Sequence, residues 1–240
     1  MKILALDSTA VVATYAITND NEPLAAETVT SGLKHSEILL PMIEKGLLSL
    51  SLSVDDIDLF ACSTGPGSFT GVRIGVSLIK GLAFGKMACV GVSSLEALAY
   101  NLIDDDTVVC AVMDARRDQL YNALFKVEGG SITRLCEDRV ISFEELLSEL
   151  SALKCELKLV GDGVNVFKSY ASESGMDISF IIDTPERYVF QSGLSVARAA
   201  LAKYNREGAI SDIELAPTYL RIPQAERERN ERLAMSKEEK

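Results

Sequence analysis

The sequence is poor in the residues that most often hold transition metals. Its 240 residues include one histidine, His35, and five cysteines, none of which stand at CxxC spacing. A zinc or iron site would therefore need an unusual set of ligands. The cysteines are odd in number and most of them fall in apolar, strand-like runs, which favours buried free thiols in a reducing cytoplasm over a disulfide framework.

Long apolar runs are also missing. The longest candidate, residues 71–84, is interrupted by Arg73 and Lys80, whereas a membrane-spanning helix needs about 18–20 apolar residues in succession. The N-terminal stretch, residues 1–7, is too short for a signal peptide and already contains Asp7. We therefore expect a cytoplasmic protein that has no association with a membrane.

Basic side chains are outnumbered by acidic ones. Lysine and arginine together number 24, whereas aspartate and glutamate number 35, which gives a formal net charge of −11. A chain with this charge repels a nucleic-acid backbone unless a local basic patch overrides the sum. Apolar residues still make up 48% of the sequence, enough for a sizeable core. The composition predicts a globular protein and disfavours direct, unaided binding of nucleic acid.

The first hundred residues predict three strands followed by alternating helices and strands. Ser93 and Glu96 form a capping-box pattern at the start of the last helix, and Pro41 predicts a kink or a boundary in the first. The order is β-β-β-α-β-α-β-α. Hydrophobic periodicity and turn residues place the strands at 2–7, 11–18, 24–30, 59–63 and 88–92, and the helices at 34–50, 71–85 and 93–102.

The remaining sequence repeats this order after a polar break at residues 104–106. Ser142 and Glu145 form a second capping-box pattern. The expected strands are 108–113, 119–127, 131–140, 157–160 and 178–182, and the expected helices are 142–150, 164–170 and 191–204.

A duplicated β-β-β-α-β-α-β-α unit is typical of one α/β architecture. It is the two-lobed fold shared by actin, sugar kinases and heat-shock ATPases, also called the ASKHA or ribonuclease H-like fold. We therefore expect an N-terminal lobe at residues 1–103 and a C-terminal lobe at 104–222. The charged stretch 223–240 is expected to be a solvated helix or a frayed tail.

Two segments at strand ends are candidates for contact with a phosphate. Asp7, Ser8 and Thr9 follow the first strand, where an actin-like ATPase turns N–H groups and hydroxyls toward a phosphate; a plain Asx or Ser/Thr turn explains them equally well. Residues 65–71 match neither the GxGxxG nor the GxxxxGK[ST] pattern, although the helix start after them offers free N–H groups. Whether a nucleotide binds stays open. The candidate vestigial nucleotide- or anion-binding residues are Asp7, Ser8, Thr9, Gly65, Gly67 and Gly161.

The helix at 71–85 carries too few polar residues for a helix that is covered on one side only. Arg73, Ser77 and Lys80 form one narrow polar stripe, and apolar residues surround the rest. Its second cover is either a neighbouring helix of this chain or a partner protein. His35 opens the preceding helix, where a lone histidine is more often an interface or hydrogen-bonding residue than a catalyst.

Several motifs together resemble the bacterial TsaB (YeaZ) family. They span residues 1–222 in the family's order and read LALDST, KHSEILLPMI, STGPGSFTGVRIG, VSSLEALA, MDARRDQLY and APTYLR. The GPGSFTGxRxG run is specific to this family. The resemblance implies the actin-like fold and a role as the non-catalytic partner of the transferase TsaD, which makes threonylcarbamoyladenosine (t6A) on tRNA. It also implies that the ATPase TsaE joins them.

The resemblance further implies that this chain lacks the chemistry of TsaD. TsaD binds its metal through a His-x-x-x-His helix, and residues 94–98 (SLEAL) stand at that place here; its glycine-rich phosphate turn corresponds to residues 114–118 (DARRD). Transfer from an adenylate needs charge neutralised at the leaving phosphate, commonly by a metal. The expectation is a pseudo-enzyme without catalytic residues, metal or cofactor, which contacts tRNA only indirectly.

Pairing with TsaD is expected through the helices at 34–50 and 71–84, and a free homodimer is expected to use the same face. Two alternatives remain open: an actin-like small-molecule kinase, which needs Asp7 at a magnesium–phosphate site, and a peptidase, for which the sequence offers neither a metal pair nor a triad. The residues that the resemblance assigns to the partner interface are His35, Ile38, Leu39, Met42, Val72, Arg73, Val76, Ile79 and Lys80.

Overall fold

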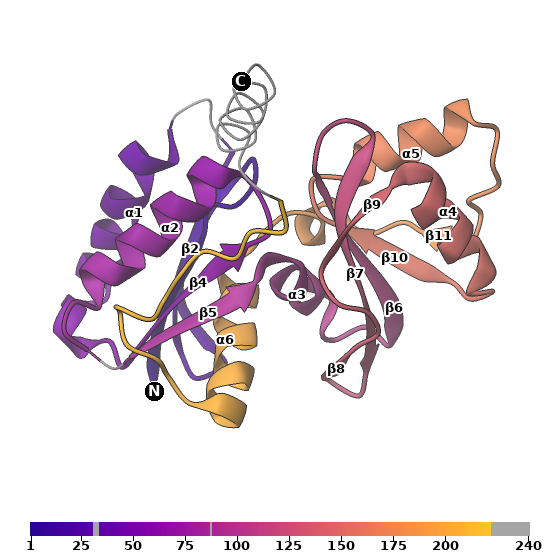
Figure 1. The fold of residues 1–240 in the computed structure, drawn as a ribbon. Helices are drawn as coiled ribbons and strands as arrows, with labels where there is room; N and C mark the ends of the chain where they lie inside the picture. The colour runs from indigo at the N-terminus through magenta and orange to yellow at the C-terminus, as the bar shows by residue number, and fades with distance from the viewer. Residues whose placement is uncertain (31–33, 87, 222–240) are drawn as a thin grey trace, which may run out of the picture.

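The chain forms two mixed β-sheets that lie side by side, each with helices on both faces (Figure 1). This arrangement is taken from a computed structural model that describes residues 1–30, 34–86 and 88–221. The charged stretch 223–240 lies outside these residues. Within them, every helix is too short or too polar to cross a lipid bilayer.

The first sheet has five strands in the order β3-β2-β1-β4-β5. The first three pair antiparallel, whereas β4 and β5 run parallel to β1 and each follows a helix, as a parallel crossover requires. The central strand β1 is buried on both faces, which explains its nearly continuous apolar sequence. The strands are β1 (Lys2–Asp7), β2 (Ala13–Asn19), β3 (Glu22–Val29), β4 (Leu59–Gly65) and β5 (Cys89–Ser93).

The second sheet has six strands in the order β11-β10-β6-β7-β8, and β9 also pairs with β7. The single strand expected at 131–140 is wrong, because β8 pairs with the end of β7 and β9 with its beginning. The chain turns between them. The strands are β6 (Thr107–Asp114), β7 (Gln119–Glu128), β8 (Ser131–Arg134), β9 (Arg139–Ser142), β10 (Leu157–Val160) and β11 (Ile181–Ile182).

The helices confirm the expected order of elements. The α1 helix continues through Pro41, so this proline does not mark a boundary. Ser142 and Glu145 close the expected capping box of α4. The helices are α1 (His35–Ser49), α2 (Phe69–Leu82), α3 (Ser94–Ala99), α4 (Phe143–Ala152), α5 (Val164–Glu173) and α6 (Gly193–Glu207), with short 3-10 helices η1 (Val54–Asp56), η2 (Tyr100–Leu102) and η3 (Glu186–Tyr188).

The two halves of the chain exchange a helix. One face of the first sheet is covered by α1 and α2, but its other face is covered by α6, from the second half. In the second sheet, α4 and α5 cover one face and α3, from the first half, covers the other. The expected boundary between residues 103 and 104 therefore divides the sequence repeat, but it does not divide the two packed units.

Docking of α6 on the first sheet depends on a glycine. A Cβ on Gly193 would overlap the backbone of Tyr15 and Ala16, and the Gly193 N–H donates to Thr14 Oγ1 at 3.0 Å. Since backbone atoms cannot rotate away, we expect Gly193→Ala to lower the free energy of unfolding by at least about 2 kcal/mol in a urea titration.

The matched control is Gly81→Ala in α2, where an added Cβ would meet no atom within 4 Å. Alanine favours a helix over glycine by up to about 1 kcal/mol, so this variant should be neutral or slightly more stable. Similar losses of stability in both variants would contradict close docking of α6.

Candidate functional site

The turn after β1 uses its polar groups inside the chain. Asp7 Oδ1 accepts hydrogen bonds from the backbone N–H and the hydroxyl of Thr9, both at 2.7 Å, and the Ser8 hydroxyl donates to the Gly71 carbonyl at 2.8 Å. All three residues of the turn are buried. The geometry is that of an Asx turn, with its hydroxyls directed at neighbouring protein atoms.

Asp7 is fully buried, and within the described residues its Oδ2 atom has no hydrogen-bond partner. Burial raises the pKa of this carboxyl above its ordinary value, whereas the nearby Ser63 side chain, the hydrogen bonds from Thr9 and the charge of His35 lower it. The turn therefore holds a carboxyl group that is costly to ionise.

The candidate phosphate-loop glycines allow backbones to approach closely. Gly67 has a φ of +155°, and a Cβ there would stand 2.8 Å from Thr9 Cβ; a Cβ on Gly161, at φ +108°, would overlap the Val112 carbonyl oxygen. Gly65 is packed in the same way against the Thr218 carbonyl. Close packing alone explains these three glycines.

A cavity of about 350 Å³ lies between the lobes beside these turns. The Asp114 carboxylate pairs with Arg116 at 2.9 Å. Burial, with a smaller contribution from the neighbouring carboxyl groups of Asp114 and Asp7, raises the pKa of Asp162 to about 6. The cavity is lined by Thr9, Ala10, Val11, Gly67, Ser68, Met113, Asp114, Ala115, Arg116, Tyr121 and Asp162.

This interlobe cavity does not fit a metal–nucleotide complex. Within the described part of the chain, its charged lining consists of Asp114, Asp162 and Arg116, and this arginine is already paired with Asp114. Among residues 1–30, 34–86 and 88–221, no group of three or more histidine, cysteine, aspartate or glutamate side chains is placed to hold a metal ion. The turn 114–118 contains no glycine, and its residues 116–118 are exposed. Arg116, Arg117 and Asp118 all adopt left-handed backbone angles there, with φ of 64°, 57° and 54°.

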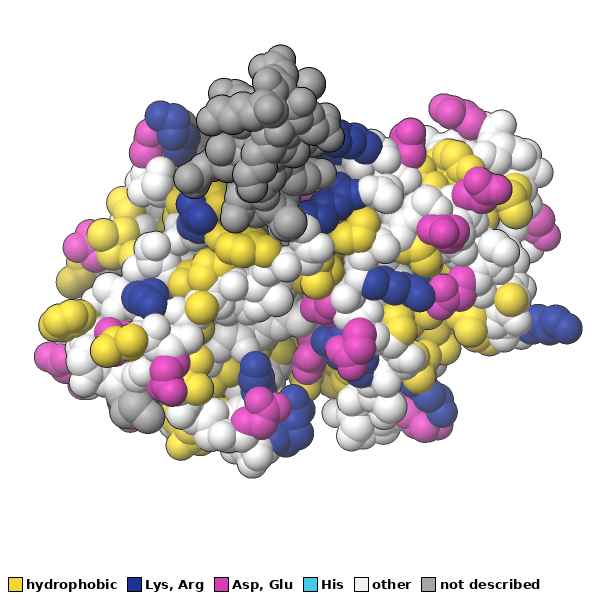
Figure 2. Space-filling view, viewed as in Figure 1, with side chains coloured by type: hydrophobic (Ala, Val, Ile, Leu, Met, Phe, Trp, Pro, Cys, Tyr) yellow, Lys and Arg dark blue, Asp and Glu magenta, His cyan; other side chains and the backbone are white. Residues whose placement is uncertain are grey.

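A second hollow, of about 560 Å³, lies between α1 and α2 and is mainly apolar; we call it the groove. Leu40 is its most open large apolar side chain, 43% exposed, whereas Ile74 and Leu78 are half-buried. Hydrophobic side chains are visible on this side of the first lobe in Figure 2. The groove is lined by His35, Ser36, Leu39, Leu40, Phe69, Thr70, Arg73, Ile74, Ser77 and Leu78.

The structure corrects much of the expected partner interface. Four of its residues are buried in the core that packs on the chain's own first sheet, so they cannot offer a docking surface in the folded chain. Periodicity identifies apolar positions but does not say which of them face the sheet. The four are Met42, Val72, Val76 and Ile79, whereas Leu39 is buried but lines the groove.

The other four expected interface residues have different environments. His35 lines the groove and its Nδ1 lies 3.2 Å from the Ser8 carbonyl oxygen. Ile38 is half-buried against the core, and exposed Arg73 lines the groove. Lys80 donates to the carbonyls of Ile213 and Leu215, so its ammonium group serves the chain's own structure.

The groove also contains residues that were not expected there, namely Leu40, Phe69, Ile74 and Leu78. The sequence contained a signal for Ile74 and Leu78, because the α2 helix is apolar on nearly all of its faces. Its inner positions contact the sheet, which leaves Ile74 and Leu78 for the second cover.

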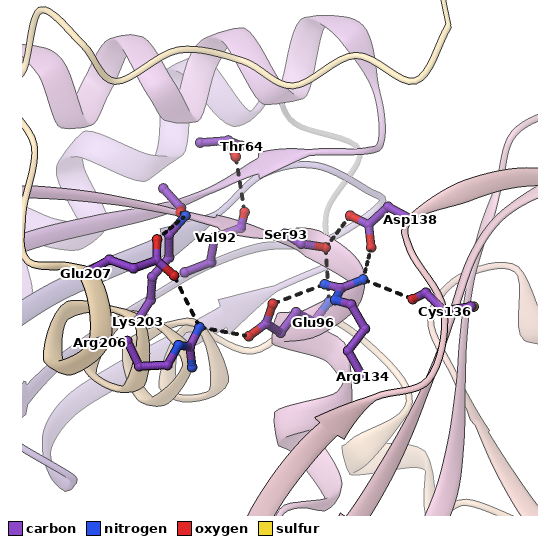
Figure 3. A network of polar contacts seen from close by, with 11 residues as sticks. Thr64, Val92, Ser93, Glu96, Arg134, Cys136, Asp138, Lys203, Arg206 and Glu207 are labelled. Atoms are coloured by element: carbon purple, nitrogen blue, oxygen red, sulfur yellow. Dashed lines mark hydrogen bonds and ion pairs between the residues drawn. The ribbon is translucent and has the colours of Figure 1, made fainter.

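Glu96 joins the lobes instead of completing a capping box. Ser93 caps α3 as expected, accepting from the Glu96 N–H at 3.2 Å, but the Glu96 carboxylate pairs with Arg134 of β8 at 3.0 Å (Figure 3). Arg134 also binds Asp138, which accepts a hydrogen bond from the Ser93 hydroxyl at 2.6 Å. The start of α3 is therefore tied to the turn between β8 and β9.

Comparisons with known proteins agree with this architecture. The family model "TsaD: tRNA N6-adenosine threonylcarbamoyltransferase" matches residues 29–226. The tRNA threonylcarbamoyladenosine biosynthesis protein TsaB of Escherichia coli (strain K12) is 32% identical over 180 residues, covering 73% of this chain and 78% of that protein. The TsaB of Bacillus subtilis (strain 168) is 28% identical over 228 residues, covering 94% and 96%.

Among solved structures, YeaZ from Pseudomonas aeruginosa superposes with a TM-score of 0.77 at 22% identity, covering 91% of this chain and 99% of that one. The duplicated order of elements in two sheets defines a two-lobed actin-like α/β fold. Within that class, the chain belongs to the TsaB (YeaZ) family, whose curated members are named for the biosynthesis of threonylcarbamoyladenosine on tRNA. The expectations of fold and family are confirmed.

The buried carboxyl of Asp162 predicts a dependence of stability on pH. Its pKa is raised from 3.8 to about 6 in the folded chain, so between these values the folded chain retains a proton that the unfolded chain has released. Stability is therefore lost as the pH rises through this interval, by at most about 3 kcal/mol.

We expect Asp162→Asn to remove this loss, so that the variant is more stable than the natural chain at pH 8 and the difference narrows as the pH falls toward 4. Urea titrations of both chains at several pH values measure it. A difference that does not change with pH would show that Asp162 ionises normally in the folded chain.

Proposed function

We propose that this chain is a non-catalytic subunit in t6A synthesis that pairs with the transferase TsaD through the groove between α1 and α2 and thereby activates it. The observation that carries the proposal is the groove itself, an apolar hollow of about 560 Å³ that the elements within residues 1–30, 34–86 and 88–221 leave open. TsaE joins through the complex, and tRNA is contacted indirectly.

The groove has the composition of a protein interface. Its centre is apolar, with Leu40, Ile74 and Leu78, and polar side chains such as His35 and Arg73 stand among them. Such a distribution, with apolar side chains at the centre and polar groups around them, is typical of protein–protein contacts. The floor of the groove is rigid, because the inner faces of α1 and α2 are buried in the core of the first lobe.

A partner of the same fold is supported by the match of this chain to the TsaD family model. A relative with the same lobe presents the equivalent pair of helices, so the two grooves can pack against each other about a pseudo-twofold axis. By the same reasoning, we expect a second copy of this chain to occupy the groove when TsaD is absent.

The lack of catalysis is supported by the surroundings of α3 and of the interlobe cavity. Ser94, Leu95 and Leu98 of α3 are buried, and Glu96 is engaged by Arg134. In the cavity the cation Arg116 is paired with Asp114, and Asp162 adds a second carboxyl group, which disfavours a triphosphate there. His35, the sole histidine of the sequence, lies on the groove side of the molecule.

The first test places a charge in the groove. Leu40→Glu should leave the fold intact, since Leu40 is 43% exposed, but it should weaken binding to TsaD at least about tenfold and favour a monomer in the free chain. Analytical ultracentrifugation and calorimetry measure both effects. The matched control is Leu153→Glu in the second lobe, where the leucine is 39% exposed. Unchanged association of Leu40→Glu would contradict the interface.

The buried neighbour Val76 distinguishes docking from folding. Val76→Glu buries a charge in the core of the first lobe. This variant should therefore lose its fold, and not only its ability to bind the partner. Circular dichroism of Leu40→Glu and Val76→Glu distinguishes loss of binding from loss of the fold.

The second test is reconstitution. TsaD, TsaE, tRNA and a threonylcarbamoyl donor should give t6A at a rate that rises strongly when this chain is added, while this chain alone should give none. Nucleoside analysis of the digested tRNA measures the product. Formation of t6A by this chain alone would overturn the non-catalytic role.

A further inference from the structure

The segment after α6, residues 208–221, returns across the first lobe and is here called the strap. In Figure 1 it is the yellow chain that leaves α6 and runs past β5 and α2 toward the second lobe. Ile210 bridges to Cys89 of β5 with two hydrogen bonds of 2.9 Å, and Lys80 donates to the Leu215 carbonyl at 3.0 Å. The Thr218 N–H donates to the Thr64 carbonyl at 2.7 Å. The strap is therefore fixed to the first lobe as far as Thr218.

The next residue of the strap, Tyr219, contacts two residues that line the groove. The ring of Tyr219 stacks on that of Phe69, with 4.9 Å between ring centroids, and its hydroxyl accepts from Arg73 Nε at 2.9 Å. The Arg73 guanidinium carbon in turn lies 3.8 Å from the Phe69 ring centroid. Phe69 and Arg73 both line the groove, so anything that docks there contacts side chains that hold Tyr219.

Two residues further on, the strap reaches the interlobe cavity. Arg221 donates from Nη1 to the Ala115 carbonyl at 2.6 Å, and its guanidinium carbon lies 6.0 Å from the Tyr121 ring centroid. Ala115 and Tyr121 line the cavity. Ala115 also begins the turn in which three successive non-glycine residues adopt left-handed angles, a conformation that persists only when surrounding contacts hold it.

We propose that the strap couples the groove to the interlobe cavity. A partner seated in the groove immobilises Phe69, Arg73 and Tyr219, and this fixes Arg221 on the Ala115 carbonyl. The turn at 114–118 is then held in its strained form and the mouth of the cavity is narrowed. When the groove is empty, the hydrogen bond from Arg221 to the Ala115 carbonyl breaks more readily and the turn relaxes. The turn at 114–118 thus has a held form and a relaxed form, and the balance between them links the groove to the interlobe cavity.

The inference rests on the proposed function only for the identity of the partner, and the free chain offers a test of its own. Hydrogen exchange at the Ala115 and Arg116 amides reports the turn, since these N–H groups bond to the Gln119 carbonyl and to Asp114 Oδ1. In Tyr219→Ala, which changes no residue of the turn, both amides should exchange about fivefold faster, the factor that corresponds to one lost hydrogen bond. Tyr219→Phe keeps the ring stack and should restore most of the protection.

The second arm adds TsaD. In the natural chain, exchange at the two amides should slow at least about fivefold further on binding. Arg221→Gln should show no slowing, and because coupling is reciprocal it should bind TsaD about fivefold more weakly. Arg187→Gln is the matched control, because the Arg187 guanidinium lies over the ring of its own neighbour Tyr188, and it should behave as the natural chain does.

The outcomes separate the two proposals. Equal slowing in Arg221→Gln and in the natural chain, or unchanged exchange in free Tyr219→Ala, would overturn the coupling while leaving the pairing intact. Absence of any complex would overturn the proposed pairing with TsaD, and the free-chain arm would then decide the coupling alone.

Discussion

The exchange of helices between the two halves is the constraint on which the rest of the structure depends. One face of the first sheet is covered by α6, which returns from the second half of the chain. One face of the second sheet is covered by α3, which comes from the first half. This fixes the lobes against each other through buried apolar contacts, and the pairing of Glu96 with Arg134 adds a polar tie at the same place. The interlobe cavity keeps its shape because the two lobes that bound it are held together by these contacts.

Much of the fold could be predicted from the sequence because strand and helix periodicities are local properties. The duplicated order of elements and the Ser142–Glu145 cap were predicted correctly. The exchange of α3 and α6 could not be predicted in this way, since an apolar helix face does not specify which of two apolar sheets it will cover. The split of residues 131–140 into β8 and β9 depends on pairing with β7, which is equally non-local.

The candidate site shows the same limit at the level of single side chains. Val72 and Val76 were expected to meet a partner and instead pack in the core on the chain's own sheet, while Ile74 and Leu78, two positions away, line the groove. The expected interface residues and the observed groove residues lie on adjacent faces of the same helix. Gly67 and Gly161 were candidate anion-binding residues in the sequence, and only the structure shows how closely the neighbouring residues approach them.

The crossing of α3 and α6 also bears on how such a chain can have arisen. A single β-β-β-α-β-α-β-α unit would leave one sheet face bare, and two copies could cover both faces only by trading their last helices, as in a domain-swapped dimer. Residues 103–106 then correspond to the join that made the swap intramolecular. Fusion would have freed each half to change its sequence independently, because its counterpart could no longer dissociate.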